Sequence, residues 1–164
     1  MTEFSDIFEA NIDFSKNFAS SGQSAIAKRG LAIITCIDSR IAPLAIVGMQ
    51  PGDAKIMRNA GARVTEDVLR TLVLATALLG VDRILVMPHT DCRMASGSEE
   101  EIHQAILEKT GIDSRAIEIR TVKDQISALK LDIQRIKSSP HLPEGISVVG
   151  AIYDVNSGFL NKIV

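Results

Sequence analysis

Short apolar runs alternate along this chain with segments whose apolar residues recur at helical spacing. The runs at residues 31–35 and 83–87 are apolar almost throughout, which is typical of strands buried on both faces of a parallel sheet. Strand–helix alternation of this kind builds a layered domain. We therefore predict an α/β fold with a mostly parallel central sheet flanked by helices. The other predicted strands are residues 54–57, 116–119, 147–153 and 159–164.

Helix signals fill the intervals between these strands. Residues 64–79 are apolar nearly all round, as in a helix packed on two sides, and Gly80 is placed to cap it. Ser98 opens a capping-box pattern, and Gly111 closes that helix. Residues 122–137 carry apolar side chains at helical spacing. The two strands that follow are expected to add an antiparallel edge to the sheet or to extend onto a partner.

The length and charge of the chain bound its class. It has 164 residues, room for one core, and no repeat or linker divides it, so we treat residues 1–164 as a single domain. A net charge of −2 argues against a nucleic-acid binder with a broad basic surface. The longest apolar stretch is too short and too charged for a membrane span, and no signal-peptide run is visible. We expect a cytoplasmic protein with reduced thiols and no nucleic-acid or membrane partner.

Residues 1–25 are predicted to form a helical arm. Four of the five phenylalanines lie here, in two pairs spaced four residues apart on helical turns. Such an arm can pack on its own subunit or lie across a second one. The polar residues 20–24 supply the separation that a swapped arm needs. The phenylalanines of these pairs are Phe4, Phe8, Phe14 and Phe18.

Two cysteines are too few for a disulfide scaffold or for a four-thiolate zinc site within one chain. Cys36 directly follows the first predicted strand, and His89 and Cys92 follow the strand at residues 83–87. Ligand sites in open α/β sheets form beyond the carboxyl ends of the strands, so these loops can bring the three side chains together. Two cysteines and one histidine around a zinc ion leave one tetrahedral position open, as in catalytic zinc sites. Taken singly, each cysteine also fits a small buried apolar residue, and the histidine a loop residue.

Asp38 and Arg40 lie in the loop after Cys36. An aspartate at this spacing can reach the fourth zinc position or its water, and Arg40 can hold that carboxylate bidentately. A plain salt bridge within the loop is the alternative. His103 and His141 have no such neighbours, and we expect both to be solvated.

Three motifs resemble those of the β-class carbonic anhydrases in their short bacterial form. They are CIDSR at residues 36–40, RNAG at 58–61 and HTDC at 89–92, and the resemblance extends over most of the chain. Two residues depart from the family pattern, because Pro88 and Arg93 stand where glycine is usual. Family members are dimers or higher assemblies whose N-terminal helices embrace the partner. The resemblance therefore implies a homodimer or a higher even oligomer, with residues 1–25 as its dimerisation arm.

The same resemblance implies a role for each candidate site residue. Cys36, His89 and Cys92 bind one zinc ion per subunit, and Asp38 forms a dyad with Arg40. In the open state water occupies the fourth zinc position. In the closed, inactive state the aspartate replaces that water as a metal ligand.

The implied activity is the reversible hydration of carbon dioxide to bicarbonate and a proton by zinc-bound hydroxide. Asn59, Ala60 and Gly61 are expected to shape the substrate pocket from the loop after the second strand. A hydrolase of carbonyl sulfide or carbon disulfide on the same zinc site is the first alternative. A zinc-binding regulatory protein without turnover is the second, and a thiol redox protein that pairs Cys36 with Cys92 is the third.

Overall fold

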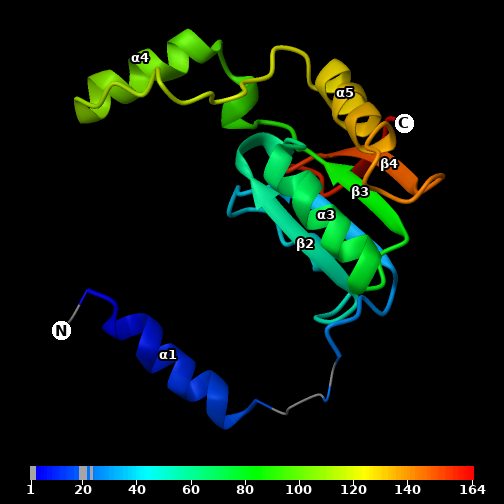
Figure 1. The fold of residues 1–164 in the computed structure, drawn as a ribbon. Helices are drawn as coiled ribbons and strands as arrows, with labels where there is room; N and C mark the ends of the chain where they lie inside the picture. Colours follow the sequence, from blue (N-terminus) through cyan, green and yellow to red (C-terminus); the bar gives the residue numbers. More distant parts are fainter. Residues whose placement is uncertain (1–2, 19–21, 23) are drawn as a thin grey trace.

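The computed structural model describes residues 3–18, 22 and 24–164. Within that part of the chain, five strands form one sheet in the order β2-β1-β3-β4-β5 (Figure 1). The first four strands are parallel and β5 is antiparallel to β4, which confirms the predicted α/β class and places the antiparallel edge within the chain. The strands are β1 (Leu31–Cys36), β2 (Ala54–Asn59), β3 (Arg83–Met87), β4 (Ser147–Tyr153) and β5 (Leu160–Lys162).

Apolar layers cover both faces of the sheet. One layer packs against α3 (Glu66–Leu78) and α5 (Gln125–Lys137), and α3 lies along the strands in Figure 1. The other layer is covered by α2 (Pro43–Ile46) and its flanking residues. Alternate residues of β1 serve the two layers, Ile34 the first and Ile33 the second. This double burial explains why the strand is continuously apolar.

Capping residues set the ends of two helices. The Thr65 hydroxyl accepts a hydrogen bond from the N–H of Val68 at the start of α3. The helix α4 (Glu99–Thr110) carries the predicted capping box at Ser98, and it ends at Gly111, whose φ of +73° is in the left-handed region. The capping box at Ser98 and the closing Gly111 were both predicted from the sequence.

The helix α5 begins later than the predicted residue 122. The Asp124 carboxylate accepts hydrogen bonds from the first N–H groups of the helix, so the helix starts at Gln125. Val122 instead donates its N–H to the Met94 carbonyl oxygen. This bond closes a long excursion of the chain, residues 96–121, which holds α4 and projects from the sheet in Figure 1. We call it the α4 excursion.

Residues 116–119 were predicted as a strand, and this prediction is wrong. The chain turns at residues 115–116, and Ile117 is 63% exposed. The N–H groups of Ile119 and Arg120 donate to the Glu99 carboxylate. A side chain therefore takes the hydrogen bonds that a neighbouring strand would supply.

The predicted N-terminal helix is α1 (Ser5–Lys16). It lies apart from the sheet in Figure 1, and none of its side chains is buried against the described residues. The phenylalanine rings of the arm are therefore exposed, that of Phe8 by 69%. Packing of the arm on its own subunit is not observed in the described part of the chain. Residues 1, 2, 19–21 and 23, which include part of the polar stretch 20–24, lie outside the described residues.

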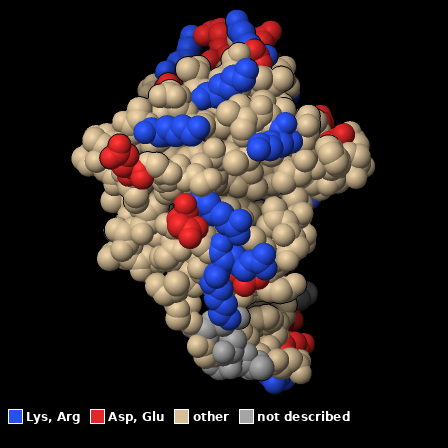
Figure 2. Space-filling view, turned by 90° about the vertical axis from the view of Figure 1, so that its right-hand side faces the viewer, with Lys and Arg blue, Asp and Glu red and all other residues tan. Residues whose placement is uncertain are grey.

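The described surface carries charges of both signs. Figure 2 shows one face on which Lys and Arg gather in a short column with acidic side chains beside them, while most of the face is uncharged. Among the helices of the described residues, none has the length and apolar character needed to cross a membrane.

Candidate metal centre

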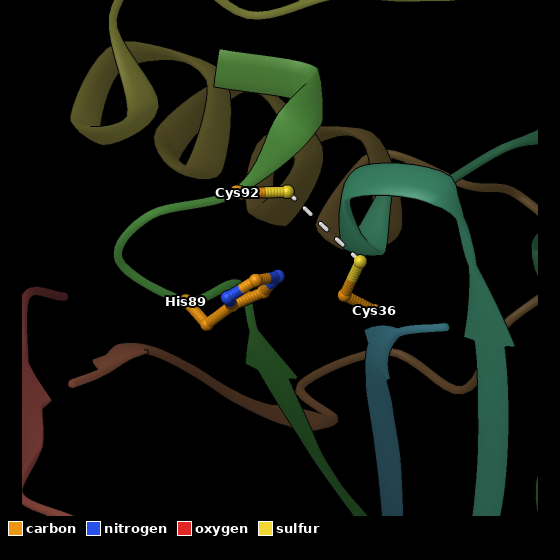
Figure 3. Close-up of side chains that lie close together, drawn as sticks. All are labelled: Cys36, His89 and Cys92. Carbon is orange, nitrogen blue, oxygen red and sulfur yellow. Dashed lines mark hydrogen bonds between the residues drawn. The ribbon is translucent and has the colours of Figure 1, made fainter. Parts of the chain in front are cut away.

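Cys36, His89 and Cys92 come together at the carboxyl edge of the sheet (Figure 3). Cys36 ends β1, and His89 follows β3, the parallel strand beside it. The ligand atoms of the three side chains lie within 4.8 Å of one another, and all three residues are buried. Two loops far apart in the sequence thus converge on one site, as the parallel topology predicts.

One ring nitrogen of His89 is engaged and the other is free. Nδ1 lies 2.8 Å from the Thr90 carbonyl oxygen, and because a carbonyl only accepts, Nδ1 carries the proton. Nε2 therefore presents a lone pair. It is buried and has no hydrogen-bond partner among the residues that the structure describes. Buried polar atoms are seldom left unpaired, so this nitrogen beside two sulfur atoms indicates a metal ligand.

The three residues fit a zinc ion. Two thiolates about 2.3 Å from a tetrahedral zinc are about 3.8 Å apart, and the Sγ atoms of Cys36 and Cys92 are 3.9 Å apart. Burial raises the pKa of the Cys92 thiol to about 11, and the neighbouring Cys36 sulfur adds to this effect. A cation must therefore displace the proton before Cys92 can be a thiolate at neutral pH.

The turn after β2 contributes to the site through its backbone. The N–H of Gly61 donates to the Cys36 sulfur at 3.4 Å. Asn59 serves the turn itself, because its side chain accepts from the N–H of Arg63 and donates to the Arg63 carbonyl oxygen. Ala60 is exposed. Of the three residues expected to shape the pocket, Gly61 is thus the one whose N–H donates to a sulfur atom of the cluster.

Arg40 holds the Asp38 carboxylate beside the cluster. Its Nε and Nη2 atoms donate to Oδ1 and Oδ2 at 3.0 and 2.8 Å, and its backbone N–H donates to Oδ1 at 2.9 Å. These bonds hold the pKa of Asp38 well below its usual range. The Oδ2 atom is 3.8 Å from Nε2 of His89. The bidentate pair is present, and it faces the proposed ligands.

Two further side chains fix the ligand loops. Arg58 donates to three backbone carbonyl oxygens within residues 36–41, at 2.6 to 3.2 Å. Gln125, the first residue of α5, donates to the His89 carbonyl oxygen at 2.8 Å. Arg58 was visible in the sequence only as part of the RNAG motif. Gln125 carried no local signal, because its partner lies on a distant loop.

The two departures from the family pattern differ in burial. Arg93 is exposed, and its Nη1 atom contacts the Ser96 hydroxyl at 3.4 Å. Its side chain therefore points outward. Pro88 is buried, and its carbonyl oxygen accepts from the N–H of Tyr153, which continues the pairing of β3 with β4.

The prediction that His103 is solvated is wrong. His103 is 7% exposed, and its Nδ1 atom lies 2.8 Å from the Ser114 hydroxyl. The chain reverses at Gly111 and returns Ser114 to the helix, a contact that helical spacing alone does not reveal. His141 is exposed, as predicted.

Comparisons with known proteins agree on one family. Residues 31–113 match the carbonic anhydrase family. Beta-carbonic anhydrase 1 of Mycobacterium tuberculosis is 31% identical over 163 residues, 99% of each chain. The crystal structure of carbonic anhydrase from Streptococcus mutans is 34% identical with a TM-score of 0.91, over 100% of this chain and 99% of that one. A carbon disulfide hydrolase of Acidianus sp. is 29% identical over 158 residues, 82% of this chain and 77% of the relative.

Proposed function

The chain belongs to the carbonic anhydrase family, in its β class, and from this membership we propose that it catalyses the reversible hydration of carbon dioxide to bicarbonate and a proton. One observation carries the proposal. The buried group of Cys36, His89 and Cys92 keeps Nε2 unpaired within the described residues, and this nitrogen faces the Asp38–Arg40 pair. The family and the donor set imply zinc as the cofactor, one ion per subunit.

Cys36, His89 and Cys92 would hold that zinc ion. Zinc bound there supplies Lewis-acid activation of water, which provides a nucleophile at neutral pH. Two thiolates formally cancel the charge of the ion. Such an ion would therefore lower the pKa of its water less than a zinc ion held by neutral ligands does. A charged hydrogen-bond acceptor close to the ligands is therefore useful to the reaction.

We assign that acceptor role to Asp38. Its carboxylate is ionised and can only accept, so it takes a hydrogen bond from the attacking water and aims the water's lone pair at the substrate carbon. Arg40 engages both carboxylate oxygens, which keeps Asp38 ionised and fixes the plane of its carboxylate. The backbone N–H of Gly61 holds the Cys36 sulfur on the other side of the site.

Stopped-flow hydration of carbon dioxide on protein of measured zinc content tests the assignment. We expect wild-type protein to hydrate carbon dioxide. The variant Cys92→Ser should lose its zinc and lower the rate by about 100-fold or more, since it removes a ligand. His141→Gln is the control, because His141 is exposed, and it should change neither quantity. Stoichiometric zinc and full activity in Cys92→Ser would contradict the proposal.

A second candidate is hydrolysis of carbon disulfide or carbonyl sulfide on the same site. The similarity to the Acidianus carbon disulfide hydrolase favours it. Release of sulfide from either substrate, faster than hydration of carbon dioxide by the same zinc-loaded sample, would support this candidate. Stoichiometric zinc with neither activity would instead support a zinc-binding protein without turnover.

We also propose that the chain forms a homodimer or higher even oligomer through α1. Apolar side chains of this helix are 55% to 69% exposed, and an isolated helix of this length is marginally stable in water. Sedimentation equilibrium should give a dimer or larger species, and Phe8→Asp with Phe14→Asp should shift it towards monomer. A monomeric wild-type protein would contradict the assignment.

We further propose a cytoplasmic location. The need for reduced thiols at Cys36 and Cys92 supports it.

A further inference from the structure

We propose that Asp91 is a positioning residue for the reaction, because its carboxylate fixes the Arg40 guanidinium and thereby holds Asp38 beside the metal ligands. The inference rests on the proposed function and deepens it. Asp91 lies between the two ligands of the second loop, His89 and Cys92, whereas Arg40 lies in the loop of Cys36. The contact therefore joins the two loops that build the site.

The Arg40 side chain is shared between two carboxylates. Its Nη1 atom donates to Oδ2 of Asp91 at 2.8 Å, and Nη2 donates to the Asp91 backbone carbonyl oxygen at 3.1 Å. Its Nε and Nη2 atoms donate to Asp38 at 3.0 and 2.8 Å. One planar guanidinium thus binds the Asp38 carboxylate in a bidentate manner and also donates two hydrogen bonds to Asp91.

The second anchor matters because Arg40 is half exposed. Its side chain is 45% exposed, so without Asp91 a flexible stem alone would hold the guanidinium against Asp38. The Asp38 carboxylate also lies 3.8 Å from Nε2 of His89, where a bound cation would attract it away from Arg40. By fixing Arg40, Asp91 biases Asp38 towards the guanidinium and leaves the open metal position to water or substrate.

The backbone at Asp91 offers a clean way to remove this contact. Its φ is +54°, in the left-handed region that favours glycine and that aspartate and asparagine tolerate better than most residues. Asp91→Gly therefore removes the carboxylate without straining the turn between the ligands. Asp91→Asn keeps the turn and an oxygen that can still accept from Nη1 of Arg40, so it should rescue part of the effect.

A merely structural ion pair would behave differently. Exposed ion pairs contribute little to folding, and Asp91 is 74% exposed. The proposal therefore predicts a change at the open metal position with unchanged folding and zinc content. Asp113 provides the matched control, because it forms an exposed ion pair with Arg115 away from the site.

The experiment measures two quantities on wild type, Asp91→Gly, Asp91→Asn and Asp113→Asn. The first is kcat and KM for carbon dioxide on zinc-loaded protein. The second is the dissociation constant of azide on cobalt-substituted protein, read from visible absorption, because an anion at the open position competes with Asp38. We expect Asp91→Gly to lower kcat by about tenfold with little change in KM and to weaken azide binding several-fold. Asp91→Asn should fall between Asp91→Gly and wild type, and Asp113→Asn should match wild type.

Kcat and azide affinity within twofold of wild type in Asp91→Gly would overturn the proposal. Should that variant fail to fold, Asp91→Asn decides: weaker azide binding at full metal content supports the proposal, and wild-type binding overturns it. Loss of metal from either folded variant would also overturn it, since the residue would then support the ligands rather than Asp38. A wild-type protein that binds azide but does not hydrate carbon dioxide would contradict the proposed function and not the role of Asp91.

Discussion

Two histidines are buried in this protein, and they lie in contrasting regions. His89 is at the carboxyl edge of the sheet, and His103 is inside the α4 excursion. In both, Nδ1 lies 2.8 Å from an oxygen atom, and a carboxylate oxygen lies 3.8 Å from Nε2. The two histidines differ in their other neighbours. Two thiols lie beside His89, whereas the oxygen beside Nδ1 of His103 belongs to a serine hydroxyl. Burial and a hydrogen bond therefore do not indicate a metal ligand, whereas the convergence of two thiols on an imidazole favours one.

The same substitution at both histidines gives the largest test of this contrast. His89→Asn should abolish zinc binding and lower carbon dioxide hydration by about 100-fold or more. His103→Asn should keep its zinc and activity but lower the free energy of unfolding by about 1–2 kcal/mol, because the Ser114 hydroxyl loses a buried partner. Metal analysis, stopped-flow rates and urea unfolding measure the three quantities. Zinc loss in His103→Asn would break the contrast.

The contrast also shows what could be read from the sequence. The meeting of Cys36, His89 and Cys92 was predictable because parallel strands deliver their carboxyl ends to one edge, a rule that needs only the strand positions. The strands at 83–87 and 147–153 were found at their full length because their apolar runs are continuous.

The misses share one physical cause. His103 becomes buried through Ser114, and residues 116–119 are held by the Glu99 carboxylate rather than by a strand. Both contacts are made by polar side chains across a chain reversal, which leaves no periodic signal in the sequence. The Arg40–Asp91 contact, which joins the two ligand loops, also leaves no periodic signal, because its residues are 51 positions apart.

The zinc affinity of the group of Cys36, His89 and Cys92 should depend on pH. Because burial raises the pKa of Cys92 to about 11, the thiol is protonated in the metal-free protein at neutral pH, and zinc must displace that proton. Each unit of acidification below that pKa should then weaken apparent zinc affinity by about tenfold or more. Competition with a chelator at several pH values measures this slope. An affinity that does not change between pH 6 and pH 8 would contradict a buried thiol that releases its proton to the metal.

Gly61→Ala perturbs the surroundings of Cys36 without replacing any of the three proposed metal ligands. A Cβ atom at Gly61 would lie 3.1 Å from Cβ of Met94, and the φ of +78° is strained for alanine. We expect the displaced N–H to loosen the Cys36 sulfur and to reduce hydration by several-fold, about 1 kcal/mol in the barrier. Gly48→Ala is the matched control, because Gly48 also has a positive φ, of +65°, but has nothing within 4 Å of an added Cβ. An equal loss of activity in the two variants would mean that backbone strain, not the contact with Cys36, is what matters, and wild-type activity in Gly61→Ala would contradict the prediction.

The smallest effect is expected in the α4 excursion, from Glu99→Gln. The Glu99 carboxylate accepts from the N–H groups of Ile119 and Arg120, at 2.7 and 3.2 Å, and an amide can accept through only one oxygen. One of these two N–H groups should lose its partner, so hydrogen exchange at residues 119 and 120 should accelerate while global stability falls by about 1 kcal/mol or less. Zinc content and hydration should stay within twofold of wild type, because the contacts of the excursion with the site, from Val122 to Met94 and from the Arg120 carbonyl oxygen to Arg63, involve none of the three metal-ligand candidates. A larger change in rate would show that the surroundings of His103 and His89 are coupled, and the two regions would then have to be treated as one.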